Sequence, residues 1–259
     1  MTTRLQKGGA LLPDMRLLVS AWSEEMSKGD PIPLLAKSLP KSTQARVRDT
    51  FVRAFRPRFI AGSPPNSWRW LRVLEDLRAD IQVIRPFYYW LTARAEPALY
   101  DFVSEVVYSR SRSTDREIRI EEAASWLTSR VRASGKMWTP LVTRKVARGM
   151  LAALRDFGIL EGAVRKRIAP ARLPPETCAL IAFCLHDMGI TGRELVRHPD
   201  WRLFLLGETG VEHLLLECHQ HGWLRFESAG NLYRTEFPEG SFKEYAHGIL
   251  GRVDQRTGS

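Results

Sequence analysis

Residues 139–170 have the sequence TPLVTRKVARGMLAALRDFGILEGAVRKRIAP, which predicts one long helix followed directly by a short β-hairpin. The helix begins at Thr139–Pro140, because proline is favoured at the first helical position, and it ends at Gly158. Its apolar side chains recur at helical spacing and form one stripe: Val146, Met150, Leu154 and Phe157. Two short β-capable pieces then lie around Glu161–Gly162. Since another helix is predicted over residues 120–131, the order is helix, helix, hairpin, which is typical of a winged helix.

Basic side chains are concentrated in this same segment. The cations that we predict to contact DNA are Arg144, Lys145, Arg148, Arg165, Lys166 and Arg167, and Arg172 follows them. Between residues 144 and 172, only Asp156 and Glu161 oppose this charge. In a winged helix the second helix enters the major groove, and a basic wing lies on a phosphate strand or in the minor groove. The pattern therefore favours nucleic-acid binding, with a winged helix that contacts proteins as the alternative.

A second basic helix is predicted in KSTQARVRDTFVRAFRPRF, residues 41–59. Ser42 or Thr43 caps its start, and Arg56–Pro57 is predicted to end it because the residue before a proline avoids helical angles. A short helix predicted over residues 32–37 precedes it, so the spacing is that of a helix-turn-helix. Its apolar side chains lie on one side of the helix: Val47, Phe51, Ala54 and Phe55.

The cations of this second helix are opposed by one acid, Asp49. They are Lys41, Arg46, Arg48, Arg53, Arg56 and Arg58. The first turn of a helix binds phosphate through its free backbone N–H groups. We therefore predict DNA contacts from Lys41, Ser42, Gln44, Arg46, Arg48, Arg53 and Arg56. The alternative is an ordinary solvated helix face, which is the usual origin of a charge run.

The whole sequence predicts a mainly α protein with two helical lobes. Further helices are predicted over residues 11–26, 68–80, 82–95, 97–110, 176–188, 191–197 and 210–221. The polar run SRSRSTDR at 109–116 lacks periodicity, so we predict the boundary between the lobes there. The predicted parts are an N-terminal lobe with the helix-turn-helix (1–115), a C-terminal winged-helix-like lobe (116–250) and a flexible tail (251–259). A second β-hairpin is predicted around residues 228–231, again directly after a helix.

Neither a metal nor a catalytic centre is predicted. His213, Cys218, His219 and His221 match no standard zinc spacing. The sequence also lacks the common phosphate-binding, dinucleotide, nucleophile-elbow and zinc-protease motifs. Aromatic residues between positions 68 and 90 are predicted to form the core of a helical bundle, and base stacking is the alternative. We therefore expect no enzyme activity, no cofactor and no small-molecule substrate.

Composition indicates a globular protein that binds polyanions. Hydrophobic residues make up 44% and charged residues 26% of the 259 positions, which excludes global disorder. Lysine and arginine number 39 against 29 acids, a net charge of +10 that favours nucleic acid and then acidic membranes. The longest apolar run, CALIAFCL at 178–185, is much shorter than the ~20 residues that a spanning helix needs. With no signal-like start and no C-x-x-C, we expect a cytoplasmic protein without membrane contact.

Five long strings of sequence resemble one known family. They are RLQKGGALLPDMRLLVSAW (4–22), FRPRF (55–59), RDFGILEGAVRKRIAP (155–170), LIAFCLHDMGITGRELVRHPDWRLFLL (180–206) and EFPEGSFKEYAHGIL (236–250). On these strings the chain resembles BrxA, the small A component of BREX bacteriophage-exclusion systems. The resemblance implies a non-enzymatic, two-lobed helical protein that binds double-stranded DNA and works with other BREX components in phage defence. It implies no catalytic residues.

The leading hypothesis is thus a BREX component that binds double-stranded DNA mainly through phosphate contacts. One alternative is an assembly adaptor whose winged helices bind partner proteins. The other is an RNA-binding protein, because basic helical proteins also bind shaped RNA.

Overall fold

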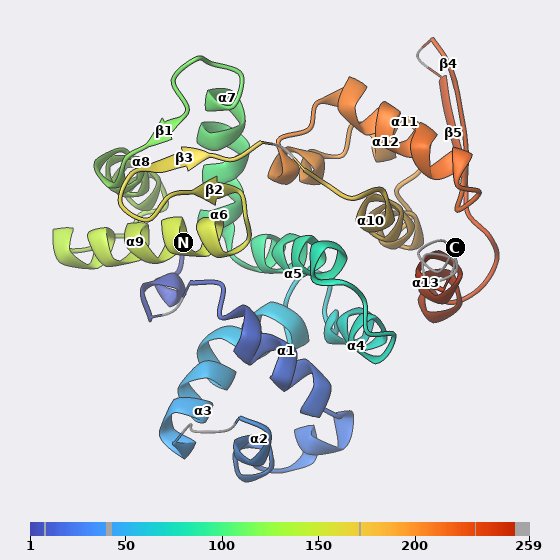
Figure 1. Ribbon diagram of the computed structural model, residues 1–259. Helices are drawn as coiled ribbons and strands as arrows, with labels where there is room; N and C mark the ends of the chain where they lie inside the picture. Colours follow the sequence, from blue (N-terminus) through green and yellow to red (C-terminus); the bar gives the residue numbers. More distant parts are fainter. Residues whose placement is uncertain (8, 40–42, 171, 231, 252–259) are drawn as a thin grey trace.

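The computed structural model describes residues 1–259 except 8, 40–42, 171, 231 and 252–259, and it is mainly helical (Figure 1). The elements before residue 111 are all helices. They are η1 (Arg4–Lys7), α1 (Leu12–Ala21), η2 (Glu24–Lys28), α2 (Ile32–Ser38), α3 (Gln44–Thr50), η3 (Phe51–Ile60), α4 (Trp68–Asp76), α5 (Ile81–Ala95), α6 (Pro97–Phe102), η4 (Val103–Val107) and α7 (Tyr108–Arg110). The prediction of a mainly α fold is confirmed.

The middle of the chain combines two helices with a three-stranded sheet. Its elements are β1 (Glu117–Ile118), α8 (Ile120–Ala133), α9 (Pro140–Asp156), β2 (Leu160–Glu161) and β3 (Lys166–Ile168). The strand order is β1-β3-β2, and both pairings are antiparallel. Thr139 caps α9 by accepting a hydrogen bond from the Val142 N–H, and Gly158 ends the turn after α9 with φ +83°. The hairpin formed by β2, β3 and residues 162–165 is called the first hairpin.

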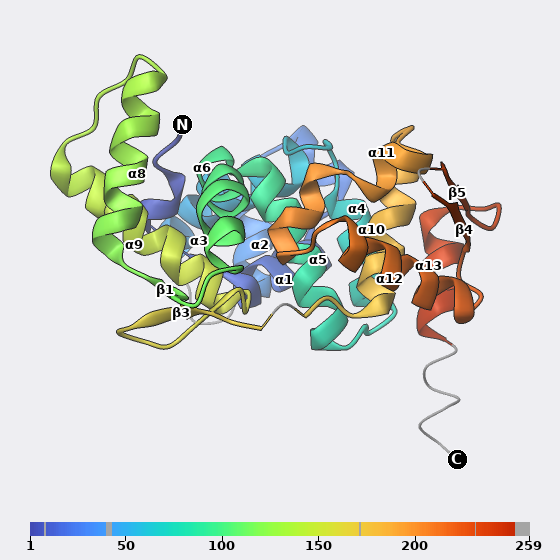
Figure 2. The same cartoon turned by 90° about the horizontal axis from the view of Figure 1, so that it is seen from above.

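The last part of the chain repeats the order of helices followed by a hairpin. Its elements are α10 (Pro175–Asp187), α11 (Gly192–Val196), η5 (Pro199–Phe204), α12 (Glu208–Gln220), β4 (Arg225–Ala229), β5 (Leu232–Glu236) and α13 (Phe242–Leu250). Strands β4 and β5 pair antiparallel from Arg225–Glu236 to Ala229–Leu232 and form the second hairpin. Seen from above, the two hairpins lie at opposite ends of the molecule (Figure 2).

Two prolines lie inside helices, although proline usually ends or kinks a helix. Pro57 lies within η3, a π-helical continuation of α3 that runs to Ile60, and Pro86 lies within α5. In η3 the Ala61 N–H donates to the Arg56 carbonyl, five residues back, at 2.8 Å. A π-helical turn is wider than an α turn, so it accommodates the proline ring without the usual clash with the preceding turn. The predicted end at Arg56–Pro57 was therefore wrong.

Arg58 belongs to the core, although the sequence groups it with the surface cations of its helix. Its side chain is 1% exposed, and its Nε lies 3.4 Å from the equally buried Glu96 carboxylate. Its Nη1 and Nη2 donate to the carbonyls of Ala10 and Gly9 at 3.0 and 3.3 Å. Burial, the largest influence, lowers the pKa of Arg58, but the guanidinium stays charged because its ordinary pKa is so high. Arg58, which was not among the residues predicted to contact DNA, therefore belongs to the core, whereas Arg53 and Arg56 of the same helix are exposed.

A second buried polar centre joins α5 and α6 to the C-terminal part of the chain. Asp200 on η5 is 2% exposed and accepts hydrogen bonds from Trp90 Nε1 at 2.6 Å, Arg94 Nη1 at 2.5 Å and the Tyr100 hydroxyl at 2.9 Å. Burial and the Asp200 charge raise the pKa of Tyr100, so the phenol keeps its proton and donates. Because these three donors all meet the carboxylate, this centre stabilises the fold rather than leaving Asp200 free to react.

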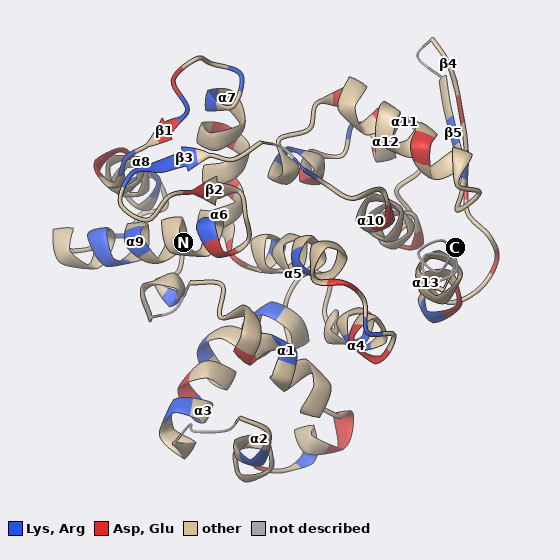
Figure 3. Ribbon diagram, viewed as in Figure 1, with Lys and Arg blue, Asp and Glu red and all other residues tan. Residues whose placement is uncertain are grey.

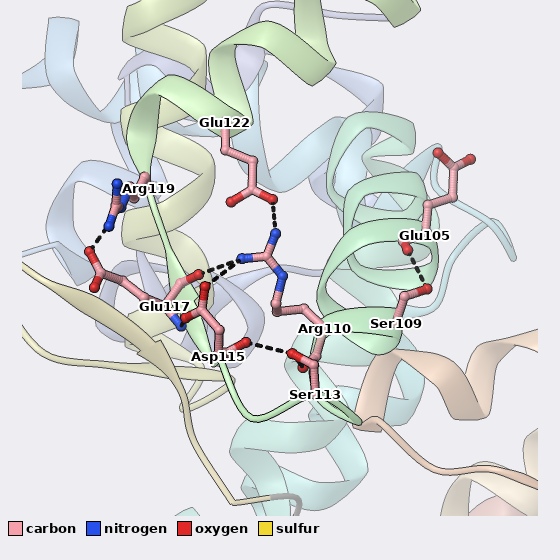
Figure 4. A network of polar contacts seen from close by, with 8 residues as sticks. All are labelled: Glu105, Ser109, Arg110, Ser113, Asp115, Glu117, Arg119 and Glu122. Carbon is pink, nitrogen blue, oxygen red and sulfur yellow. Dashed lines mark hydrogen bonds and ion pairs between the residues drawn. The ribbon is translucent and has the colours of Figure 1, made fainter.

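The polar run at 109–116 is held by specific contacts. Arg110 donates to the Glu117 carbonyl at 2.9 Å and to the Glu122 carboxylate at 2.5 Å, which ties the end of α7 to β1 and α8 (Figure 4). Ser113 also donates to the Asp115 carbonyl at 2.7 Å. One continuous cluster of buried residues extends from Leu5 to Ile249, on both sides of this run. The division into lobes at 115–116 stays a prediction.

The N-terminal segment lies directly against α9. Leu5 on η1 is 1% exposed, and a Cβ on Gly149 would lie 1.8 Å from the Leu5 carbonyl oxygen. Gly9 is similarly close to α9, because a Cβ there would lie 3.1 Å from Ala153 N. Glycine at position 149 is therefore required for the start of the chain to pack on the helix.

Candidate nucleic-acid interface

Helix α3 presents most of its predicted contact residues to solvent. The Thr43 hydroxyl caps the helix by accepting from the Arg46 N–H at 3.3 Å, while Val47 faces the core. Gln44, Arg46, Arg48, Arg53 and Arg56 are all exposed on α3 and its continuation η3. Lys41 and Ser42 lie outside the described residues. The separation of an apolar face from a cationic face is thus present over the described part of this helix.

Acids lie beside two of these arginines. Arg48 Nη2 is 3.0 Å from Asp30 Oδ2, and Arg53 Nε is 2.5 Å from Asp49 Oδ1, one helical turn earlier. The four side chains are 43–60% exposed, so these ion pairs are solvated and weak. Exchanging either acid for a DNA phosphate would therefore cost little free energy. The two acids do, however, reduce the positive electrostatic potential of this helix.

Helix α9 presents a row of cations on the face away from its core stripe. Arg144, Lys145 and Arg148 are exposed, whereas Val146, Ala147 and Met150 are buried. Arg144 has a distant acid, with Nη2 3.8 Å from Glu121 Oε1. The cations therefore point to solvent because the intervening apolar residues fix the rotation of the helix.

The first hairpin carries the remaining predicted cations. Arg165 and Arg167 are exposed, and the Lys166 ammonium donates to the Ala163 carbonyl at 3.0 Å across the turn. Val164 at the tip is 94% exposed. Ile168 is buried, so β3 alternates between core and surface in the manner of a half-buried strand. Gly162, with φ +88°, allows the tight turn between β2 and β3, in which Val164 and Arg165 lie.

Helix α9 and the first hairpin contribute to one hollow of about 530 Å³. Its cations are Arg119, Arg148, Arg165 and Lys166, and its acids are Glu117 and Glu121. We call this the basic hollow. Arg119 was not among the predicted residues, and it donates to Glu117 at 3.3 Å. Arg119 lies between β1 and α8, as the N-cap residue of α8.

The predicted cations form two separate groups. Figure 3 shows lysines and arginines of α3, α9 and β3 along the same side of the molecule, with α3 below α9 and β3 above it. Arg148, Arg165 and Lys166 share the basic hollow, whereas the α3 arginines do not line it. The tertiary structure thus brings together the helix and hairpin that are close in sequence, and leaves α3 as a second basic element.

The C-terminal helix and hairpin differ in charge from this first pair. Helix α12 contains no lysine or arginine, and Glu208, Glu212 and Glu217 lie on it. On the second hairpin, Arg225 lies 2.7 Å from Glu227, and Arg234 is paired with Glu236. Of the two helix-and-hairpin units, α9 with the first hairpin therefore carries the positive surface, and α12 with the second hairpin does not.

The described part of the chain offers no group of three or more His, Cys, Asp or Glu side chains able to hold a metal ion. The cysteines Cys178, Cys184 and Cys218 are buried and free. Burial raises the pKa of the Cys184 thiol, so it remains neutral. Among the same described residues, no helix is both long and apolar enough to cross a membrane.

A model of the BrxA family matches residues 2–183, which include α3, α9 and the first hairpin. The chain belongs to the BrxA family. The resemblance seen in the sequence is thereby confirmed, and membership supports a role associated with BREX antiviral defence. No protein with a curated record matches the chain significantly.

Two solved structures share the fold. One, described as the SspB crystal structure, has a TM-score of 0.60 and 13% identity, covering 99% of this chain and 88% of that chain. The other, the magnesium ion-bound SspB crystal structure, has a TM-score of 0.56 and 12% identity, covering 100% and 86%. At these identities the similarity establishes a common architecture and nothing about chemistry.

Proposed function

We propose that this BrxA-family protein is a non-enzymatic component of a BREX system that binds double-stranded DNA mainly through phosphate contacts. The observation that carries the proposal is the basic hollow. Arg148 of α9, Arg165 and Lys166 of the first hairpin and Arg119 after β1 meet there. Cations from a helix and from the hairpin next to it suit a duplex, which presents a groove with phosphates on both sides.

In this proposal β1, α8, α9 and the first hairpin form a winged helix, and the hairpin is its wing. Helix α9 lies in the major groove with Arg144, Lys145 and Arg148 directed toward the DNA. Arg165 and Arg167 contact a phosphate strand beside the groove. Val164, which is 94% exposed at the tip, reaches the minor groove, where apolar side chains can insert between neighbouring bases.

The helix formed by α3 and its continuation η3 supplies a second set of phosphate contacts through Arg46, Arg48, Arg53 and Arg56. It belongs to the proposed N-terminal lobe, so a duplex bound to both elements would span residues on both sides of the 115–116 boundary. Phosphate contacts carry no base identity, and binding is therefore expected to tolerate many sequences. The protein would act in the cytoplasm, where the host DNA lies.

A mobility-shift titration tests this function. A duplex of about three helical turns and a structured RNA of equal length are titrated with the full chain at ~50 mM and ~200 mM salt, because phosphate contacts weaken steeply with salt. We expect duplex binding that is strong at the lower concentration and resists competition by the RNA. Absence of duplex binding at the lower concentration would overturn the proposal, and preference for the RNA would reassign the basic surface to RNA.

A second candidate function, assembly with other BREX proteins, is favoured by the charge of the C-terminal unit. Helix α12 lacks lysine and arginine, and the arginines of the second hairpin are paired with glutamates. Such a surface repels phosphate and suits protein contacts. Co-purification with BREX components from nuclease-treated lysate, lost after Leu216→Arg on the exposed face of α12, would support it. Retention of the components by that variant would count against it.

A further inference from the structure

A second hollow lies where the N-terminal, middle and C-terminal parts of the chain meet. It has a volume of about 820 Å³, within the ~300–1,000 Å³ that ligand pockets usually have. Its walls come from the start of α5, the turn after α9, the connection between β3 and α10, and the end of η5. We call it the central hollow. In Figure 1, α5 lies between α9 and α10, and none of the residues predicted to bind DNA lines this hollow.

The walls of the central hollow are mostly apolar and firmly held. Ile159, Leu173, Leu205 and several prolines line it. Three aromatic residues also line it, and the Tyr89 ring packs on Phe157 at 5.3 Å and on Phe204 at 5.6 Å between centroids. The Tyr89 hydroxyl donates to the Leu203 carbonyl at 3.1 Å, which fixes this ring. The hollow therefore has a rigid floor, as a preformed binding site requires.

The charged groups of the central hollow all have one sign. Arg85 and Arg172 line it, and the described lining contains no aspartate or glutamate. Arg85 Nη2 donates to the Gln82 amide oxygen at 3.3 Å, but its Nε is buried and has no hydrogen-bond partner among the described residues. A buried guanidinium N–H without an acceptor is costly, and a carboxylate or phosphate is its best partner. Together with the like charge of Arg172, this unsatisfied donor favours an anionic ligand.

A glycine fixes where the guanidinium lies. A Cβ on Gly158 would be 3.6 Å from Arg85 Nη2 and 3.7 Å from its Cζ, so the group rests over the backbone of the turn after α9. Gly158 has φ +83°, which disfavours any other residue. The positive charge is thus held at one edge of the hollow, beside its apolar walls.

We propose that the central hollow binds a segment of a partner protein in which a carboxylate is adjacent to an apolar side chain. The carboxylate accepts from Arg85, with Arg172 at the rim, and the apolar side chain packs on Ile159 and Leu205. A nucleic acid fits less well, because base recognition uses exposed aromatic faces or several polar groups. Here Tyr89, Phe157 and Phe204 are only 0%, 4% and 2% exposed.

Two short peptides test this site on the full chain. The probe is acetyl-Leu-Glu-Leu-amide, and the matched control is acetyl-Leu-Gln-Leu-amide, which has the same shape without the charge. Methyl NMR signals of Ile159, Leu173 and Leu205 report binding. We expect saturable shifts with the Glu peptide and affinity lower by about tenfold for the Gln peptide, as loss of a charged hydrogen bond implies. Arg85→Gln should abolish the difference, and Arg132→Gln, an exposed arginine on α8, should preserve it.

Several outcomes would overturn the proposal. Equal binding of the two peptides, or shifts confined to other methyl groups, would show that Arg85 recognises no carboxylate. If Arg85→Gln weakens duplex binding and leaves the peptides unaffected, the hollow belongs to the nucleic-acid path instead. Should Arg85→Gln fail to fold, Arg172→Gln at the exposed rim provides the same comparison, with an expected loss of about threefold. Duplex binding by the wild-type chain is measured separately, so failure of this site leaves the proposed function standing.

Discussion

The proposed role of the basic hollow predicts a specific change in the salt dependence of DNA binding. Each phosphate neutralised contributes about −0.9 to the slope of log affinity against log salt concentration. Four cations line the hollow, so it would contribute about −3.6 if each meets one phosphate. Removing two of them in the double variant Arg148→Gln/Arg165→Gln should make the slope shallower by about 1.8.

The control removes the same amount of charge from the C-terminal unit. Arg225→Gln/Arg234→Gln likewise removes two cations, here both from the second hairpin, where each arginine is paired with a glutamate. Fluorescence anisotropy with a labelled duplex between ~50 mM and ~200 mM salt measures both slopes. Over this roughly fourfold range of salt, the factor by which affinity decreases should be about twelve times smaller for the basic-hollow variant than for the wild type. An unchanged slope in this variant, together with a shallower slope in the control, would refute the assignment.

Three further predictions concern the stability of the fold. Glu96→Gln should lower the free energy of unfolding by about 3–5 kcal/mol, measured by urea denaturation, because it leaves the buried Arg58 charge without its carboxylate; a loss below ~1 kcal/mol would mean that the backbone carbonyls suffice. Gly149→Ala should cost about 1–3 kcal/mol by displacing η1 from α9, whereas Gly248→Ala, where a Cβ meets no atom within 4 Å, should be neutral or stabilising; equal effects would contradict the close approach. Burial lowers the pKa of His198 below its ordinary 6.5, so the unfolded chain takes up this proton at a higher pH than the folded chain. The contribution of His198 to the free energy of unfolding should therefore be fully present above pH 6.5 and decrease as the pH falls below it. Urea titrations at several pH values should show a smaller decrease for His198→Gln.

Local signals explain which features the sequence predicted. Helix α9 was predicted with its start at Pro140, because proline and a regular apolar stripe act within a few residues. The mainly α fold and the family followed from the same kind of evidence. The position of the first hairpin was predicted as well, since Gly162 adopts the positive φ that such a turn needs.

Features that depend on distant contacts were missed. Arg58 became a core residue because Glu96, 38 positions away, is buried beside it, and nothing near Arg58 in the sequence signals that partner. Pro57 stayed inside a helix because the wider turn of η3 accommodates its ring. Arg119 lines the basic hollow only because β1 pairs with β3, which lies far along the chain beyond α8 and α9. The DNA contacts themselves stay predictions, which the slopes above will test.

The packing of η1 on α9 has a consequence for dividing this protein into fragments. A fragment that begins at residue 116 would contain the whole proposed winged helix, yet it would lack Leu5, which lies against Gly149. The part of α9 that Leu5 covers would become exposed and would promote aggregation. This part of the helix borders the cations proposed to face DNA. Binding measured on such a fragment would therefore mix aggregation with recognition, whereas adding residues 1–10 back as a separate peptide should restore solubility if the two pieces recombine.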